Sequence, residues 1–107
     1  MKLLRIVKSS NPNKKWDAVF MVEGKEKKVS FGSAGMRDYT LVSNKLSKFY
    51  LPKILDRNVV RDSYRRRHKK DLETKDPMRA GYLSYYLLWN KKTLASSIKD
   101  YKKKFKL

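Results

Sequence analysis

The sequence contains no cysteine and only one histidine, His68. Without cysteine the chain cannot form a disulfide framework or a thiolate metal site, which fits a reducing compartment. A single histidine also removes His-paired metal centres and leaves little for a Ser–His or Cys–His mechanism. We therefore expect no metal, no cofactor and no enzymatic activity.

Long apolar runs are missing as well. The N-terminal segment MKLLRIVKSS has an apolar run too short for a signal peptide, and Arg5 interrupts it. Nothing in the chain approaches the roughly 20 apolar residues of a membrane-spanning helix. The sequence therefore predicts a protein that is intracellular, not secreted, and has no membrane span.

Acidic residues are scarce, whereas basic ones are abundant. The 107 residues include 28 Lys and Arg against 10 Asp and Glu, for a net charge of +18. Residues 1–57 carry a net charge of +8 and residues 58–107 one of +10, so the charge is spread through the chain. Solubility alone needs a net charge of only roughly 2–8 in a small domain. We expect a polyanionic partner, with nucleic acid ahead of an anionic membrane or an acidic protein.

The N-terminal third predicts antiparallel strands. Residues 3–7 are a short apolar segment, and residues 16–22 alternate in polarity as a half-buried strand does. Glu23-Gly24 begins a tight turn, and residues 25–31 return. We expect a β-hairpin or, with the first segment, a three-stranded antiparallel sheet. Because an isolated hairpin is marginally stable, it should pack on the helices with its aromatic face, formed by Trp16, Phe20 and Phe31.

Residues 36–75 predict a basic helical segment. The loop Gly32-Ser33-Ala34-Gly35 favours a plain strand-to-helix turn over a phosphate-binding loop, because it lacks the Lys-Ser/Thr ending of a P-loop. A helix entry follows at Asp38-Tyr39-Thr40. Pro52 should break or kink the weakly amphipathic segment 41–55. A further helix is expected from about Asn58 to about Leu72.

Residues 76–107 predict a helical hairpin. Asp76-Pro77 suits a helix start, because Asp caps the first turn and Pro loses no hydrogen bond there. Residues 78–89 are apolar nearly all round and predict a buried helix, with Tyr85 on its outer surface. A second helix from about Thr93 has one apolar stripe, formed by Leu94, Ile98, Tyr101 and Phe105.

Two cationic runs are the candidate phosphate contacts. The first has six Lys or Arg in residues 61–70, at a density that places positive charge round most of a helix. Tyr64 and His68 in this run could stack or hydrogen-bond, although a solvated helix face with Tyr64 packed down is compatible with the same pattern. The candidates are Arg61, Arg65, Arg66, Arg67, His68, Lys69 and Lys70, with Lys99, Lys102, Lys103, Lys104 and Lys106 as a second patch. Replacing Arg65, Arg66 and Arg67 by Ala should flatten the salt dependence of binding without unfolding the domain.

Two other chemistries are considered and set aside. Asp17 followed by Glu23-Gly24-Lys25 or Glu26-Lys27-Lys28 resembles the carboxylate-and-lysine set of magnesium-dependent nucleases. That spacing is also the spacing of a hairpin turn, and such triplets are common in a lysine-rich chain. The aromatic group in residues 82–89 could stack on bases, but core packing is favoured for it.

Segments across most of the chain resemble one family. They are Trp16 to Phe20, Lys28 to Gly32 with Gly35, Asp38 to Thr40, Tyr64 to Lys70, Asp76 to Met78 with Gly81, Leu88 to Lys91, and Ser97 to Phe105. Together they are similar to a family of small, basic, functionally uncharacterised proteins encoded by nucleocytoplasmic large DNA viruses. Members often carry Trp where this chain has Tyr86 and Pro where it has Lys92, and residues 41–58 look like an insertion. The resemblance implies a viral origin and a place in the virion or viral factory, but no mechanism.

These observations predict a single small α+β domain over residues 1–107, with a β-rich part at 1–32, a basic helical segment at 36–75 and a helical hairpin at 76–107. We expect three to four helices packed on the sheet. The leading hypothesis is a non-enzymatic, largely sequence-independent nucleic-acid-binding protein that condenses or organises viral DNA, with DNA favoured over RNA. The alternative is a minor capsid or internal scaffold protein that binds acidic viral structural proteins. A third option is an accessory subunit of a nucleic-acid-processing complex.

Overall fold

The computed structural model describes all 107 residues and begins with a three-stranded antiparallel sheet. Its strands are β1 (Lys2–Lys8), β2 (Lys14–Val22) and β3 (Lys25–Ser33), in the spatial order β1-β2-β3. Glu23 and Gly24 have φ values of 51° and 79°, so this two-residue turn matches the right-handed twist of the strands that it joins. The three-stranded form of the expected sheet is therefore confirmed.

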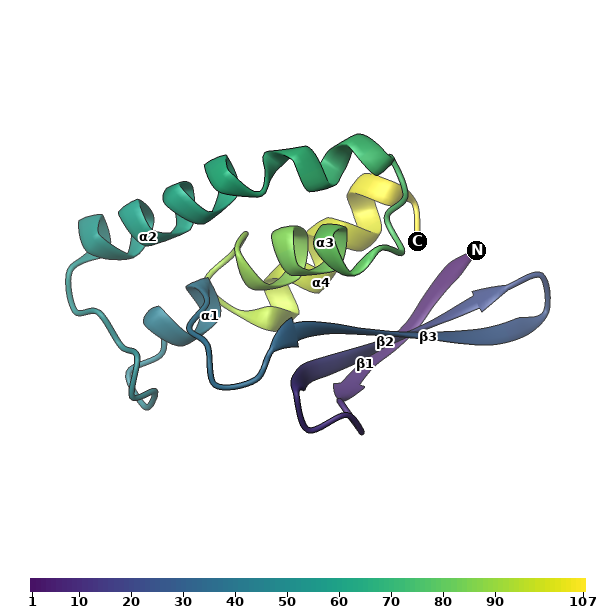
Figure 1. Ribbon diagram of the computed structural model, residues 1–107, viewed down its shortest axis with the longest axis horizontal. Coiled ribbons are helices and arrows are strands. Elements are labelled where there is room, and N and C mark those ends of the chain that lie inside the picture. Colours follow the sequence, from purple (N-terminus) through teal and green to yellow (C-terminus); the bar gives the residue numbers. More distant parts are fainter.

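Six helical segments follow the sheet (Figure 1). They are α1 (Tyr39–Val42), α2 (Ile54–Arg67), the 3₁₀ segment η1 (Lys69–Thr74), α3 (Ala80–Leu83), the π-helical turn η2 (Ser84–Leu88) and α4 (Leu94–Phe105). In Figure 1 the sheet lies below, α2 lies above, and α3 and α4 lie between them. The α+β class is confirmed. No helix is both long and apolar enough to span a bilayer.

The core forms where the sheet meets the C-terminal helices. Phe20 and Phe31 of the sheet are fully buried, and so are Leu83, Leu87 and Tyr101 of the helices. The predicted stripe of α4 is confirmed, because Leu94, Ile98 and Phe105 pack against the same cluster as Tyr101. We call α3 with η2 the first arm of the hairpin and α4 the second arm. The rings of Tyr82 and Phe105 are in contact, with 5.8 Å between their centroids, so the start of the first arm lies beside the end of the second. The two arms are antiparallel, as in the expected helical hairpin.

The first arm begins later than predicted. Asp76 caps only a single turn, in which its carboxylate accepts a hydrogen bond from the Met78 N–H at 3.0 Å, and the chain is extended again at Arg79 before helix α3. The Pro77 carbonyl accepts a hydrogen bond from the buried Tyr101 hydroxyl at 2.6 Å. The expected helix start at Asp76-Pro77 is therefore wrong by about one turn, because helix α3 begins at Ala80.

The expected exposure of Tyr85 is also wrong. Tyr85 lies in η2, where the Trp89 N–H bonds the Ser84 carbonyl five residues back instead of four. This wider turn rotates the following side chains relative to a regular α-helix. The guanidinium of Arg65 also lies over the Tyr85 ring, 4.1 Å from its centroid. Tyr85 is consequently buried.

The middle of the chain differs from its predicted bounds. Helix α2 begins at Ile54, not Asn58, and after Arg67 the chain tightens into 3₁₀ geometry. Pro52 interrupts helical structure as expected, and residues 43–53 form turns. Arg57 holds this loop, since its guanidinium donates to the carbonyls of Leu51 and Pro52 at 2.5 and 3.0 Å. The start of α2 is therefore fixed by contacts with the loop, which helix periodicity does not report.

Candidate nucleic-acid interface

The cationic run of α2 and η1 divides into two kinds of residue. Arg66, Arg67, Lys69 and Lys70 are exposed, and none of them forms an ion pair or hydrogen bond within the chain. No residue of α2 or η1 is fully buried, although Val60 and Tyr64 pack against the core. These four side chains can reach a phosphate backbone without giving up an internal contact.

Arg65 has a different position from its neighbours. Its guanidinium donates to the Trp89 carbonyl at 2.9 Å and to the Tyr85 carbonyl at 3.5 Å, while it stacks on the Tyr85 ring. These carbonyls lie at the end of η2, where a helix has no intrahelical donors to offer them. Arg65 therefore links α2 to the hairpin. The expectation that its removal leaves the fold intact stays a prediction, and we do not count Arg65 among the free phosphate contacts because these bonds occupy it.

Arg61 and His68 are also partly engaged. Arg61 pairs with Asp62 at 3.0 Å and lies over the Tyr39 ring at 4.8 Å. The Nδ1 atom of His68 lies 3.2 Å from a carboxylate oxygen of Asp71. Both side chains remain partly exposed, but each has less charge to offer than the four unpaired cations of the run.

The four lysines of α4 and Lys106, the residue after it, are all exposed and make no ion pair. Lys104 alone has an internal contact, 5.0 Å from the centroid of the Tyr86 ring. Tyr82 joins the two cationic runs, because its hydroxyl donates to the Leu72 carbonyl at 2.7 Å while its ring packs on Phe105. Segment η1 and the C-terminal end of α4 therefore lie near each other, on the right in Figure 1.

Three aromatic rings form a continuous stack beside the first run. Tyr64 lies between His68, at a centroid distance of 4.1 Å, and Trp89, at 4.3 Å, and the planes are tilted by only 20° and 8°. The i to i+4 spacing of Tyr64 and His68 explains the first contact, whereas Trp89 comes from the hairpin. Burial raises the pKa of Tyr64 to about 12, so its hydroxyl stays neutral in ordinary buffers.

A cleft of about 620 Å³ lies next to this stack. Its lining comes from α2, from α3, from the start of β2 and from the end of β3. It includes Tyr64, Arg67, His68 and Trp89. It also brings in Lys14 and Arg37, which sequence reasoning did not single out. No periodic signal links those two residues to α2, because only the folded chain places them together.

Two glycines set the shape of the cleft. A Cβ at Gly32, whose φ is 79°, would lie 2.8 Å from the Leu88 Cδ1 atom. A Cβ at Gly81 would lie 2.9 Å from that of Asp71. Real Cβ contacts are essentially never this short, so glycine lets β3 approach η2 and lets α3 approach η1. The small-residue loop after β3 thus positions the cleft wall.

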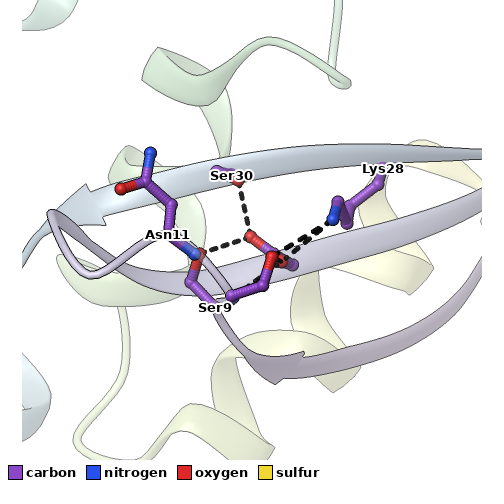
Figure 2. Close-up of polar contacts among 6 residues, drawn as sticks. Ser9, Asn11, Lys28 and Ser30 are labelled. Atoms are coloured by element: carbon purple, nitrogen blue, oxygen red, sulfur yellow. Dashed lines mark hydrogen bonds and ion pairs between the residues drawn. The ribbon is translucent and has the colours of Figure 1, made fainter.

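Asp17 is the carboxylate that a nuclease would need, and its environment is structural. Figure 2 shows the side chains of Ser9, Ser30 and Lys28, which are its partners. It accepts hydrogen bonds from Ser30 at 2.6 Å and Ser9 at 2.7 Å, and Lys28 lies 3.8 Å away. These hydroxyl donors, more than the lysine, lower its pKa to about 2. No group of three or more His, Cys, Asp or Glu side chains could hold a metal ion.

Comparison with known proteins adds one partial match. Residues 4–50 match the model of DUF5754, a family of unknown function. The matched segment covers the sheet, α1 and part of the following loop, which is less than half of the chain, and it extends into the segment 41–58 that resembled an insertion. No curated protein and no solved structure matches the chain. The viral origin inferred from the resemblance stays a prediction.

Proposed function

We propose that this protein binds nucleic acid through the phosphate backbone, largely without sequence preference. The observation that carries the proposal is a set of exposed cations without an ion pair or hydrogen bond in the chain, which belong to the end of α2, to η1 and to α4 with the residue after it. Their members are Arg66, Arg67, Lys69, Lys70, Lys99, Lys102, Lys103, Lys104 and Lys106. We call them the cationic end.

The chemistry of this set favours phosphates over base edges. Lysine is a compact, strongly hydrated charge on a flexible stem, and seven of the nine residues are lysines. Such side chains position a protein on a backbone and read no sequence. Duplex DNA is our preferred ligand because the chain resembles proteins of large DNA viruses. In that setting the protein would condense or organise the genome in the virion or viral factory.

The test is the affinity for a random DNA duplex across salt. A protein that contacts 6–10 phosphates should lose roughly 10³–10⁵ in affinity between about 50 and 200 mM salt. The fourfold variant with Gln at Arg66, Arg67, Lys69 and Lys70 should reduce the slope of log affinity against log salt by roughly 3–4. Arg65 stays in place, so that folding and binding are not confused.

A matched control removes charge elsewhere. Lys25 and Lys27 are exposed at the β2–β3 turn and make no ion pair. Their replacement by Gln should change the slope much less than the double variant Lys69→Gln, Lys70→Gln. Equal changes in the two double variants would show that net charge acts without a binding surface. Weak binding with a shallow slope in the native chain would exclude the proposal.

One observation favours the second candidate, an acidic structural protein of the virion as partner. The first turns of α2 expose Ile54, Leu55 and Val59, with 58%, 73% and 59% of each residue accessible. Lys53 and Arg57 flank these apolar side chains. An apolar surface bordered by cations fits a protein partner better than a phosphate backbone. Retention on DNA-free capsid shells, lost in Leu55→Ser and kept in Lys70→Gln, would favour this candidate.

A further inference from the structure

We propose that the cleft beside the aromatic stack holds one unpaired nucleotide of a bound strand, with its base on His68 and its phosphate among cations of the lining. This inference rests on the proposed function and deepens it. The cationic end accounts for attraction to any phosphate backbone, whereas the cleft would recognise a base that has left a duplex.

The size and lining of the cleft suit a nucleotide. Its volume of about 620 Å³ lies within the range of roughly 300–1,000 Å³ that is usual for small-molecule sites. Val60, Leu88 and Trp89 supply apolar surface, and the ends of the β2–β3 hairpin supply polar and charged groups. A planar apolar body that carries a charged group matches this combination.

The charges of the lining are not equally available. Lys15 is held by Asp38, with its Nζ atom 2.5 Å from the carboxylate, and only 13% of its side chain is accessible. His68 lies against Asp71. Lys14, Arg37 and Arg67 line the same cleft without an ion pair or hydrogen bond from their side chains. Three cations around one concavity favour a phosphate group.

The aromatic stack has one covered end and one open end. Tyr64 is covered on both faces, and Trp89 is buried at the far end. His68 has only one face on Tyr64, and 41% of its side chain is accessible. A fourth ring can therefore join the stack only at His68. Bases stack on aromatic side chains of single-strand binders in this way.

Duplex DNA cannot use this position with its bases paired, because paired bases present only their edges in the grooves. An unpaired nucleotide presents a free face and can reach a side chain while its neighbours stay on the protein surface. The cleft therefore distinguishes an unpaired nucleotide from a paired one, and it does not distinguish one base from another.

The test compares three DNAs of equal length: a paired duplex, the same duplex with one bulged nucleotide, and that duplex with an abasic residue at the bulge. The two bulged forms carry the same phosphates and differ by one base. The native protein should bind the bulged base roughly tenfold more tightly than the abasic site. His68→Ala should bring this ratio to about one, and His68→Phe should retain it because a ring remains.

Lys70→Ala is the matched control, since Lys70 is outside the cleft lining. It should weaken binding to all three DNAs alike and leave the ratio unchanged. If the native protein binds bulged and abasic DNA equally, the inference is wrong while the proposed function stands. If no DNA binds at all, the proposed function itself fails.

A deoxynucleoside monophosphate separates the two sources of such a ligand. Added at millimolar concentration, it should abolish the preference for the bulged base if a free nucleotide fills the cleft as well. An unchanged preference would show that phosphates of a strand are needed, which supports the strand-borne form of the proposal. A preference that is lost equally with inorganic phosphate at the same charge would overturn the assignment of the base to His68.

Discussion

The sheet half (residues 1–57) and the helical half (residues 58–107) of this protein carry nearly equal charge and differ in how deeply their ion pairs are buried. In the sheet half, Lys15 pairs with Asp38, Lys28 with Asp17, and Arg5 with Glu26. Two of those carboxylates, Asp17 and Asp38, are buried. The helical half has no buried carboxylate, and its three ion pairs are all exposed or partly exposed.

The net charge of a region and the burial of its ion pairs are separate properties. Net charges of +8 and +10 for the two parts of the sequence suggest similar attraction to polyanions. Each part has three ion pairs and leaves most of its cations unpaired, so pairing does not separate them. They differ in burial, because a buried carboxylate must be matched by a cation or by hydrogen-bond donors. The net charge of a region therefore does not show whether its charges also support the fold.

The largest expected effect comes from breaking a buried pair of the sheet half. Asp38 accepts hydrogen bonds from Lys15 and from the Leu41 N–H at the start of α1. Asp38→Ala should lower the free energy of unfolding by about 3–5 kcal/mol, because it leaves a largely buried lysine without a partner. Urea unfolding measures this loss. Glu26→Ala, at a pair that is half exposed, should cost less than about 1 kcal/mol. Equal losses would refute the distinction between buried and exposed pairs.

A second change tests the one arginine of the cationic run that serves the fold. Arg65→Ala should reduce the free energy of unfolding by about 2–3 kcal/mol, since two carbonyls of the hairpin lose a charged donor. Arg66→Ala, one residue along and exposed, should change it by less than about 0.5 kcal/mol. Thermal unfolding of both variants at one salt concentration gives the comparison. A stable Arg65→Ala protein would return that residue to the list of phosphate contacts.

How far the sequence predicts this structure depends on whether the signal is local. The strand over residues 16–22 and the apolar stripe of α4 lie within single elements, and both are confirmed. The expected half-burial of that strand is wrong, because Asp17 to Phe20 are all buried. The Pro77 carbonyl, before α3, is bound by the Tyr101 hydroxyl, 24 residues away. The role of Arg65 depends on a carbonyl at the same separation. Neither contact leaves a mark on periodicity or helix capping.

The candidate site follows the same division. Both cationic runs are readable as dense local charge, and the Tyr64–His68 contact follows from helix spacing. The cleft could not be predicted from the sequence, because its lining combines residues that are far apart in the chain. Lys14 is at the start of β2, Arg37 follows β3, and Trp89 belongs to the C-terminal hairpin. An aromatic at the end of an apolar helix predicts only core packing. Its second role, as the covered end of a stack, depends on the tertiary fold.

A third prediction concerns the acid side of the stability profile. Asp17 has a pKa of about 2 in the fold against an ordinary value of 3.8, because serine hydroxyls stabilise its charged form. Its contribution is therefore fully present above about pH 4 and is lost as the pH falls toward 2. In urea titrations over this range, Asp17→Asn should lose roughly 2 kcal/mol less than the native chain. Parallel curves for the two proteins would contradict the assignment.

The smallest expected effect on stability comes from removing exposed lysines of the helical half. Replacing Lys102, Lys103 and Lys106 by Gln should change the free energy of unfolding by less than about 0.5 kcal/mol per residue, because these side chains contact nothing in the fold. Their removal lowers self-repulsion, so a slight gain in stability is expected. Differential scanning calorimetry at low salt measures the shift. A clear loss of stability would show that α4 uses its lysines internally.

The strand order β1-β2-β3 has a consequence for the behaviour of the chain at high concentration. Each outer strand has a neighbour on one side only, and such an edge can pair with the edge of another molecule. Here exposed cations are placed along both edges, at Lys2, Arg5 and Lys8 on β1 and at Lys25, Lys27 and Lys28 on β3. Two like-charged edges repel each other before backbone pairing begins. We expect these cations to disfavour edge-to-edge pairing and fibre growth whether or not a ligand is bound.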